Sequence, residues 1–180
     1  GLRKVELGSL PFSELPQLPR LSDIATSLGP GFLLVVDASN VPTGDAVAAW
    51  AAVTSATTNP AAPPNMWLRG HDVEALARWA TVAGVAGTTH GVRVEDVSGS
   101  LERHLSRLRD LGVTALALPR PSWSGGLVAM THRFRREAWA TGAEHTRMAV
   151  ELLTMGVDAV EGPHPDRLTD AVTEMRSDGR

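Results

Sequence analysis

Short apolar runs alternate with longer amphipathic stretches along most of this 180-residue chain. The run FLLVVDAS at residues 32–39 is typical of a strand that is buried on both faces. Helical periodicity is clearest at 98–112, where leucines recur on one face at positions 101, 105, 108 and 111. Strands that alternate with helices form βα units around a parallel sheet. The pattern therefore predicts an α/β fold.

Six parallel strands are expected, each followed by a helix. The strands are predicted near residues 32–39, 65–70, 87–93, 113–119, 137–142 and 157–161, and the helices at 44–56, 72–84, 98–112, 125–136, 143–156 and in PDRLTDAVTEM at the C-terminal end. Asp72 suits a helix N-cap, and Gly112 and Gly156 stand where glycines end helices. The segments at 108–119 and 152–163 share the order helix end, glycine, strand and proline. Such repeated modules suit a (β/α) barrel or a doubly wound sheet.

Composition and missing motifs exclude several classes of function. The net charge is −3 and the 17 basic residues are spread along the chain, which argues against nucleic acid or an anionic membrane as the main partner. No apolar run approaches the roughly 18 residues of a membrane span. Without cysteine the chain has no disulfides and no thiolate metal site. No strand is followed by a glycine-rich phosphate loop, and neither a G-x-S-x-G nor an H-E-x-x-H motif occurs. We therefore expect one domain over residues 1–180 with a small-molecule ligand.

Three segments resemble the glycerophosphodiester phosphodiesterase family. They are LPRLSDIATSLGPGFLLVVDAS (18–39), LGVTALALPRPSWSGGLVAMTHRF (111–134) and REAWATGAEHTRMAVELLTMGVDAVEGPHPDRL (136–168). The most specific part is the spacing from Trp139 to Gly156-Val157-Asp158 and on to Pro165-Asp166-Arg167-Leu168. The family consists of metal-dependent TIM-type barrels. The resemblance implies an incomplete barrel with about six of eight strands, related to enzymes that hydrolyse glycerophosphodiesters to glycerol 3-phosphate and an alcohol in lipid metabolism.

The motifs that begin the family's catalytic site are missing in their usual order. These are a His-Arg-Gly on the first strand, a Glu-x-Asp on the second and a His-Asp soon after. The sequence LRGHD at 68–72 lies where the family has its fourth strand, and we interpret it as a coincidence. The chain begins with Gly1, not with methionine. We therefore expect a cytoplasmic fragment that starts just past the His-Asp, is inactive alone, and exposes strand edges through which it could form a homodimer.

The resemblance also implies a set of site residues at the carboxyl ends of the strands. Asp37 takes the place of a metal-binding glutamate, and Mg²⁺ or Ca²⁺ is the cofactor expected for the complete enzyme. Ser39 replaces the family's lysine and removes a phosphate contact. Trp139 matches an aromatic residue at the mouth of the pocket. For both Asp37 and Trp139 a structural role, as a strand-end cap and as a core side chain, is the alternative.

Three further residues are candidate substrate ligands. Glu161 ends the last strand at the same rim, although Pro163 replaces the family's aspartate and a solvated loop residue is the alternative. Arg69 and His71, near the end of the strand at 65–70, could contact a phosphate, with simple surface polarity as the alternative.

Two other functions remain open. The chain could be a truncated, non-catalytic relative that binds a ligand or a partner. It could also be an unrelated enzyme with a βα-barrel fold.

Overall fold

The computed structural model describes residues 34–37, 66–83, 86–89 and 100–177. Six strands of this part form one parallel sheet in the order of the chain. They are β1 (Leu34–Asp37), β2 (Met66–Gly70), β3 (Ala86–Thr89), β4 (Ala115–Pro119), β5 (Glu137–Thr141) and β6 (Ala159–Val160). Among these strands the order never reverses, whereas a doubly wound sheet has a reversal at its switch point.

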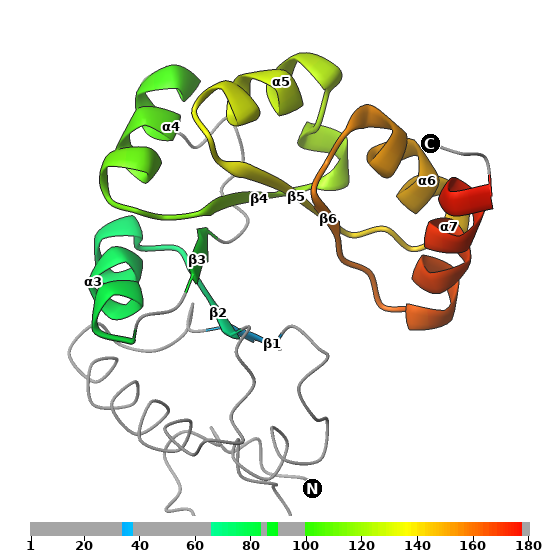
Figure 1. Ribbon diagram of the computed structural model, residues 1–180, viewed down its shortest axis with the longest axis horizontal. Helices are drawn as coiled ribbons and strands as arrows, with labels where there is room; N and C mark the ends of the chain where they lie inside the picture. Colours follow the sequence, from blue (N-terminus) through cyan, green and yellow to red (C-terminus); the bar gives the residue numbers. More distant parts are fainter. Residues whose placement is uncertain (1–33, 38–65, 84–85, 90–99, 178–180) are drawn as a thin grey trace, which may run out of the picture.

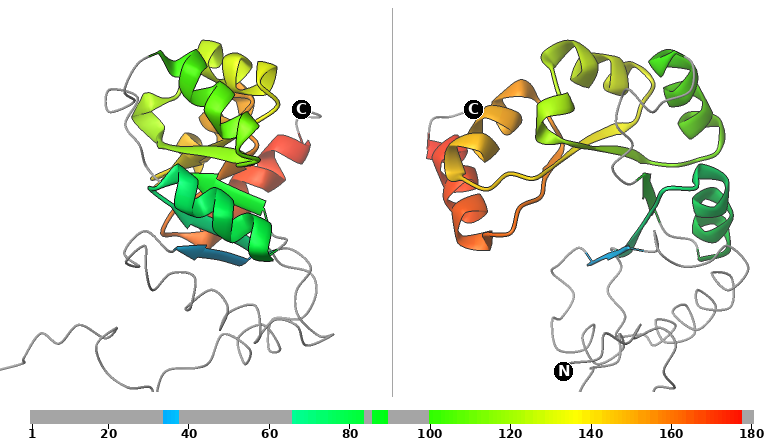
Figure 2. Two further views of the ribbon diagram at one scale, coloured as in Figure 1. Left: turned by 90° about the vertical axis from the view of Figure 1, so that its left-hand side faces the viewer. Right: turned by 180° about the vertical axis from the view of Figure 1, so that it is seen from behind.

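The helices of the described part lie in an arc on the outer side of the curved sheet (Figures 1 and 2). They are α3 (Val73–Ala83), α4 (Leu101–Asp110), α5 (Gly125–Arg133), α6 (Thr146–Met155) and α7 (Pro165–Ser177), with a 3₁₀ turn, η4 (Arg120–Ser122), after β4. None of them is long and apolar enough to cross a membrane.

The predicted α/β fold with a parallel sheet is confirmed. Strands and helices fall within a few residues of their predicted positions. The helix expected at 44–56 lies outside the described residues.

Alternation along the strands gives the sheet two different faces. In β4, Leu116 and Leu118 pack into the large core beneath the helices, while Ala115 and Ala117 point to the opposite, inner face. Burying a leucine side chain contributes about 1.5–3 kcal/mol, so the helix-covered face supplies most of the hydrophobic stability. The inner face carries a smaller buried cluster, in which Ala115 and Ala117 join Trp139.

Local signals in the sequence account for the helix ends. The backbone N–H of Ala75 donates to Oδ1 of Asp72 at 2.9 Å, so the predicted N-cap of α3 is confirmed. Gly112 and Gly156 have φ values of +74° and +98°, the left-handed conformation that favours glycine after a helix. These two turns lead directly into β4 and β6, and so set where each strand begins.

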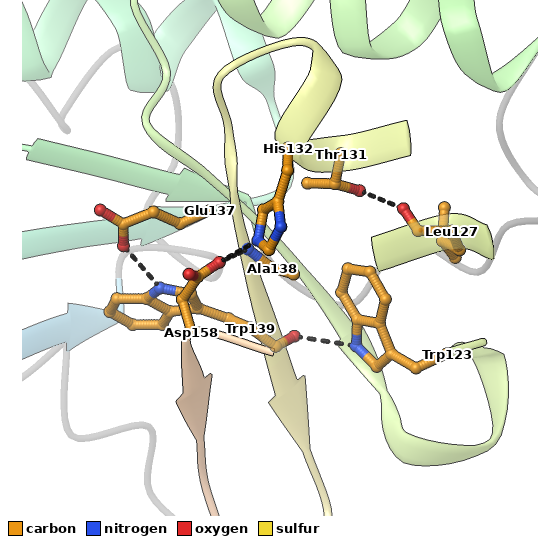
Figure 3. Close-up of polar contacts among 8 residues, drawn as sticks. All are labelled: Trp123, Leu127, Thr131, His132, Glu137, Ala138, Trp139 and Asp158. Carbon is orange, nitrogen blue, oxygen red and sulfur yellow. Dashed lines mark hydrogen bonds and ion pairs between the residues drawn. The ribbon is translucent and has the colours of Figure 1, made fainter. Parts of the chain in front are cut away.

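Asp158 joins three elements at the start of β6 (Figure 3). Its Oδ2 accepts a hydrogen bond from the backbone N–H of Ala138 at 2.7 Å and lies 2.8 Å from Nε2 of His132 on α5. Its own N–H donates to the carbonyl of Ala138 at 2.8 Å. One side chain therefore holds β5, β6 and α5 in register.

Replacing Asp158 by alanine should lower the free energy of unfolding by about 1–3 kcal/mol, because the Ala138 N–H and His132 lose their acceptor. Asp158→Asn keeps an acceptor oxygen and should cost less. Urea unfolding measures both variants, with Asp170→Ala on the exposed face of α7 as the control. Equal stability of Asp158→Ala and the control would show that these contacts contribute nothing.

Candidate functional site

A buried arginine and an exposed glutamate meet at the carboxyl end of the sheet. Arg69 lies within β2, and only 5% of the residue is exposed. Its Nη1 donates to Oε1 of Glu161 at 3.1 Å, and its Nη2 bonds to Oε2 of the same carboxylate. The guanidinium fork thus binds both carboxylate oxygens, across 92 positions of sequence.

The backbone fixes the position of Glu161 directly after β6. Its N–H donates to the carbonyl of Ala140 at 2.8 Å, and its carbonyl accepts from the N–H of Ala143 at 3.0 Å. Gly162 follows in a tight space, because a Cβ at this position would lie 2.0 Å from the carbonyl oxygen of Ala143. The close approach of the chain at Gly162 to the chain at Ala143 holds the Glu161 backbone against the end of β5.

Gly162→Ala should displace this segment and break the Arg69–Glu161 pair, because the clashing atom belongs to the backbone and cannot swing away. Forced overpacking of this kind typically costs about 1–3 kcal/mol of stability. Thermal unfolding would measure the loss. Gly126→Ala is the matched control, since its nearest neighbour would be 4.0 Å from the new Cβ. An unchanged melting temperature for Gly162→Ala would contradict the close approach.

Two tryptophans stack beside the ion pair on the inner face. The rings of Trp67 on β2 and Trp139 on β5 have centroids 4.6 Å apart and an interplanar angle of 35°. Nε1 of Trp139 donates to Oε2 of Glu137 at 3.1 Å (Figure 3). Trp123 also holds β5, because its Nε1 donates to the Trp139 carbonyl at 3.1 Å. Trp139 is therefore a buried, fixed aromatic surface.

A pocket of about 270 Å³ adjoins these residues. Side chains from three strands and one helix line it, including Val35 of β1, Trp139 and Thr141 of β5, Glu161 after β6 and Leu168 of α7. Its volume is slightly below the usual range for small-molecule sites, about 300–1,000 Å³. The pocket suits a small ligand, with an apolar wall at Trp139 and a charged edge at Glu161.

The structure brings several of the predicted site residues together. Trp139 and Glu161 line one pocket, and Arg69, which lies inside β2 and is buried, contacts Glu161. Asp37 ends β1 next to Arg69 in the register of the sheet, so the two residues face the same side at the same level. His71 is exposed after the end of β2 and does not line the pocket. The substrate and metal roles of these residues stay predictions.

The described residues do not fit the expected divalent metal. Among them, no three His, Cys, Asp or Glu side chains gather into a group that could hold a metal ion. The carboxylate of Glu161 is already bound by Arg69. No chemical step can therefore be assigned to a metal held by this part of the chain.

The sequence did not predict the partners of these side chains. Glu161 is exposed, as a loop residue would be, but it is also ion-paired with Arg69. No local motif marks Trp67 as a site residue, although it stacks on Trp139. The period of two along a strand is the signal that identifies Trp67 as a site residue. Trp67 and Arg69 alternate with the buried Leu68 and so share the inner face.

Comparison with known proteins finds similarity in structure and not in sequence. No protein-family model matches the sequence, and no curated protein sequence matches it either. A structure from Silicibacter pomeroyi, assigned as a glycerophosphoryl diester phosphodiesterase, aligns with a TM-score of 0.69 and 17% identity, over 88% of this chain and 57% of that one. An Oleispira antarctica phosphodiesterase in complex with its product sn-glycerol-3-phosphate aligns with the same TM-score and identity, over 86% and 61%.

A third structure, from Galdieria sulphuraria and assigned as a glycerophosphodiester phosphodiesterase, has a TM-score of 0.74 and 13% identity over 94% of this chain and 73% of that one. The chain spans less than two thirds of the first two proteins. Identity this low establishes a shared fold and not a shared activity. Over the part that it covers, the chain has the fold of glycerophosphodiester phosphodiesterases.

Proposed function

We propose that this chain is a relative of glycerophosphodiester phosphodiesterases and forms the substrate-binding side of a TIM-type (β/α) barrel. The strand order supports this architecture, because barrel strands follow one another around the ring without reversal. Contacts across the inner face support it too. Trp67 reaches Trp139 from β2 to β5, and Arg69 reaches Glu161, which only a strongly curled sheet allows.

The buried guanidinium of Arg69 is the single observation that carries the proposal. A phosphodiester bears a negative charge on oxygens that a guanidinium fork can bind in pairs. Arg69 stands at the carboxyl end of the sheet, where enzymes of this architecture build their sites. The apolar wall formed by Trp139 would pack against the carbon atoms of a glycerol.

Hydrolysis needs more than this binding surface. The parent reaction yields glycerol 3-phosphate and an alcohol, as in the metabolism of phospholipid headgroups, and requires a general acid and base. A divalent metal such as Mg²⁺ or Ca²⁺ would neutralise charge on the phosphoryl oxygens when bound. The sequence lacks His-Arg-Gly and Glu-x-Asp. We therefore propose that this chain alone binds the ligand through Arg69 and Trp139 without hydrolysing it.

A non-catalytic binding module is the second candidate. It is favoured by the pairing of Glu161 with Arg69, which already occupies a carboxylate at the carboxyl end of the sheet. In that case the natural ligand would be a small phosphate ester that is retained and released unchanged.

A binding and an activity measurement on the purified chain test the proposal. Isothermal titration calorimetry should detect binding of sn-glycerol 3-phosphate, with glycerol as the uncharged control. Hydrolysis of bis(p-nitrophenyl) phosphate should be absent with and without EDTA. If sn-glycerol 3-phosphate binds no better than glycerol, the proposed site is wrong. EDTA-sensitive turnover would instead mean that the chain itself holds catalytic residues, with His71 and Asp72 beside Arg69 in LRGHD (68–72) as the first to test.

The strand edges suggest a second copy of the chain as a partner. Within the described sheet, β1 and β6 each pair with one neighbouring strand. Unpaired edges favour association with another chain. Sedimentation of the purified protein should reveal a dimer, and a monomer at all concentrations would exclude this partner.

A further inference from the structure

The two members of the Arg69–Glu161 pair differ sharply in burial. The Arg69 side chain is 6% exposed, whereas the Glu161 side chain is 54% exposed. A guanidinium keeps its charge in proteins, and a buried charge needs an opposite charge beside it. A carboxylate that is half in water can leave its partner and regain its hydration. The arginine therefore needs an anion, but this anion need not be Glu161.

The carboxylate also leaves part of the guanidinium unused. Nη1 and Nη2 of Arg69 bond to Glu161, while the buried Nε has no hydrogen-bond partner among the residues that the structure describes. An unsatisfied buried donor is costly, and such atoms are rare in folded proteins. A phosphate group offers more acceptor oxygens than a carboxylate does. It could bind the same fork and leave fewer donors unsatisfied.

Glu161 lies between the pocket and the arginine. It lines the 270 Å³ pocket, whereas Arg69 does not line it and contacts the carboxylate. A ligand in the pocket therefore meets the carboxylate of Glu161 first, which repels an anion. Rotation of this side chain into water would open the guanidinium to the pocket.

We infer that Glu161 is an internal competitor, which occupies the anion site of Arg69 until a phosphate group displaces it. The inference rests on the proposed function and deepens it, because it assigns the regulation of the same site. The resting protein is mostly in the closed, self-paired state, so its apparent affinity for phosphate is reduced by the fraction that is open. A ligand without a strong negative charge cannot displace the carboxylate, and this would select phosphate esters over neutral polyols.

Titration with inorganic phosphate tests the inference. We compare the wild type with Glu161→Gln, which keeps the shape of the side chain and removes its charge. Glu151→Gln is the matched control, because Glu151 is also exposed and paired with an arginine, Arg120, but lies on α6 and does not line the pocket. Isothermal titration calorimetry should show that Glu161→Gln binds phosphate about 10-fold more tightly or better, whereas Glu151→Gln equals the wild type.

A second variant, Glu161→Asp, covers the case in which Glu161→Gln is poorly folded. Glu161→Asp carries a carboxylate that is one methylene shorter, and it should bind phosphate with an affinity between those of the other two proteins. Phosphate should raise the melting temperature of Glu161→Gln more than that of the wild type. If both variants are folded and bind phosphate as weakly as the wild type or more weakly, Glu161 is no competitor and the inference fails.

Titration of the wild type and Glu161→Gln with sn-glycerol 3-phosphate, beside inorganic phosphate, separates this inference from the proposed function. Tighter phosphate binding by Glu161→Gln, with no preference of either protein for sn-glycerol 3-phosphate over inorganic phosphate, would keep the competitor and reject the glycerophosphodiester ligand. Binding of sn-glycerol 3-phosphate by the wild type, with no gain in Glu161→Gln, would keep the ligand and reject the competitor.

Discussion

Replacing Arg69 by methionine should reduce the affinity for sn-glycerol 3-phosphate by about 100-fold or more. Hydrogen bonds to charged groups contribute about 1.5–3 kcal/mol each, and the arginine can form at least two with a phosphate. Methionine fills a similar volume with a flexible apolar chain, and the freed Glu161 is exposed enough to be solvated. The variant should therefore remain folded and lose binding, as calorimetry would show.

Arg120→Met is the matched control for this change. Arg120 is also paired with a glutamate, Glu151, but it is about one third exposed and does not line the pocket. The Arg120→Met variant should bind sn-glycerol 3-phosphate as tightly as the wild type does. If Arg69→Met and Arg120→Met bind equally well, the anion site lies elsewhere.

Replacing Trp139 by alanine should destabilise the protein by about 3–5 kcal/mol, the usual cost of removing a large buried aromatic side chain. The ring is only 6% exposed and stacks on Trp67, so its loss leaves a cavity on the inner face next to the pocket. Typical domains are stable by about 5–15 kcal/mol in total, so this substitution should remove a large fraction of the stability. Urea unfolding and near-UV circular dichroism would measure the effect.

Trp139→Phe separates packing from the ligand contact. It keeps an aromatic ring against Trp67 and loses the hydrogen bond to the Glu137 carboxylate, so its stability should fall by about 1.5–3 kcal/mol, less than that of Trp139→Ala. It should still bind sn-glycerol 3-phosphate, because an aromatic wall of the pocket remains. A Trp139→Ala variant as stable as the wild type would mean that the ring is not part of the core.

The sequence predicted the elements of the fold well, because the signals are local. Asp72 caps α3, and Gly112 and Gly156 turn the chain into β4 and β6 as expected. Apolar runs followed by prolines located β4 and β6, which ends at Val160. What periodicity left open was the order of the strands. Barrels and doubly wound sheets are both built from the same βα units. Only the pairing of β1 through β6 shows that the order of the strands has no reversal.

The candidate site was predicted only in part, because its contacts are distant in sequence. Trp139 and Glu161 were placed at one rim from the resemblance, and they line one pocket. The bond between Arg69 and Glu161 joins strands 92 positions apart, and no local pattern encodes which side chains meet across a curved sheet. Asp158 was noticed as part of a motif, but its bond to the Ala138 N–H follows from the register of β5 and β6.

A crystal structure of the chain with sn-glycerol 3-phosphate tests the central claim most directly. We predict that the phosphate lies within hydrogen-bond distance of the Arg69 guanidinium, that the Glu161 carboxylate has turned away, and that the glycerol carbons pack against Trp139. If the ligand binds elsewhere while Arg69 and Glu161 stay paired, the account of this site is wrong.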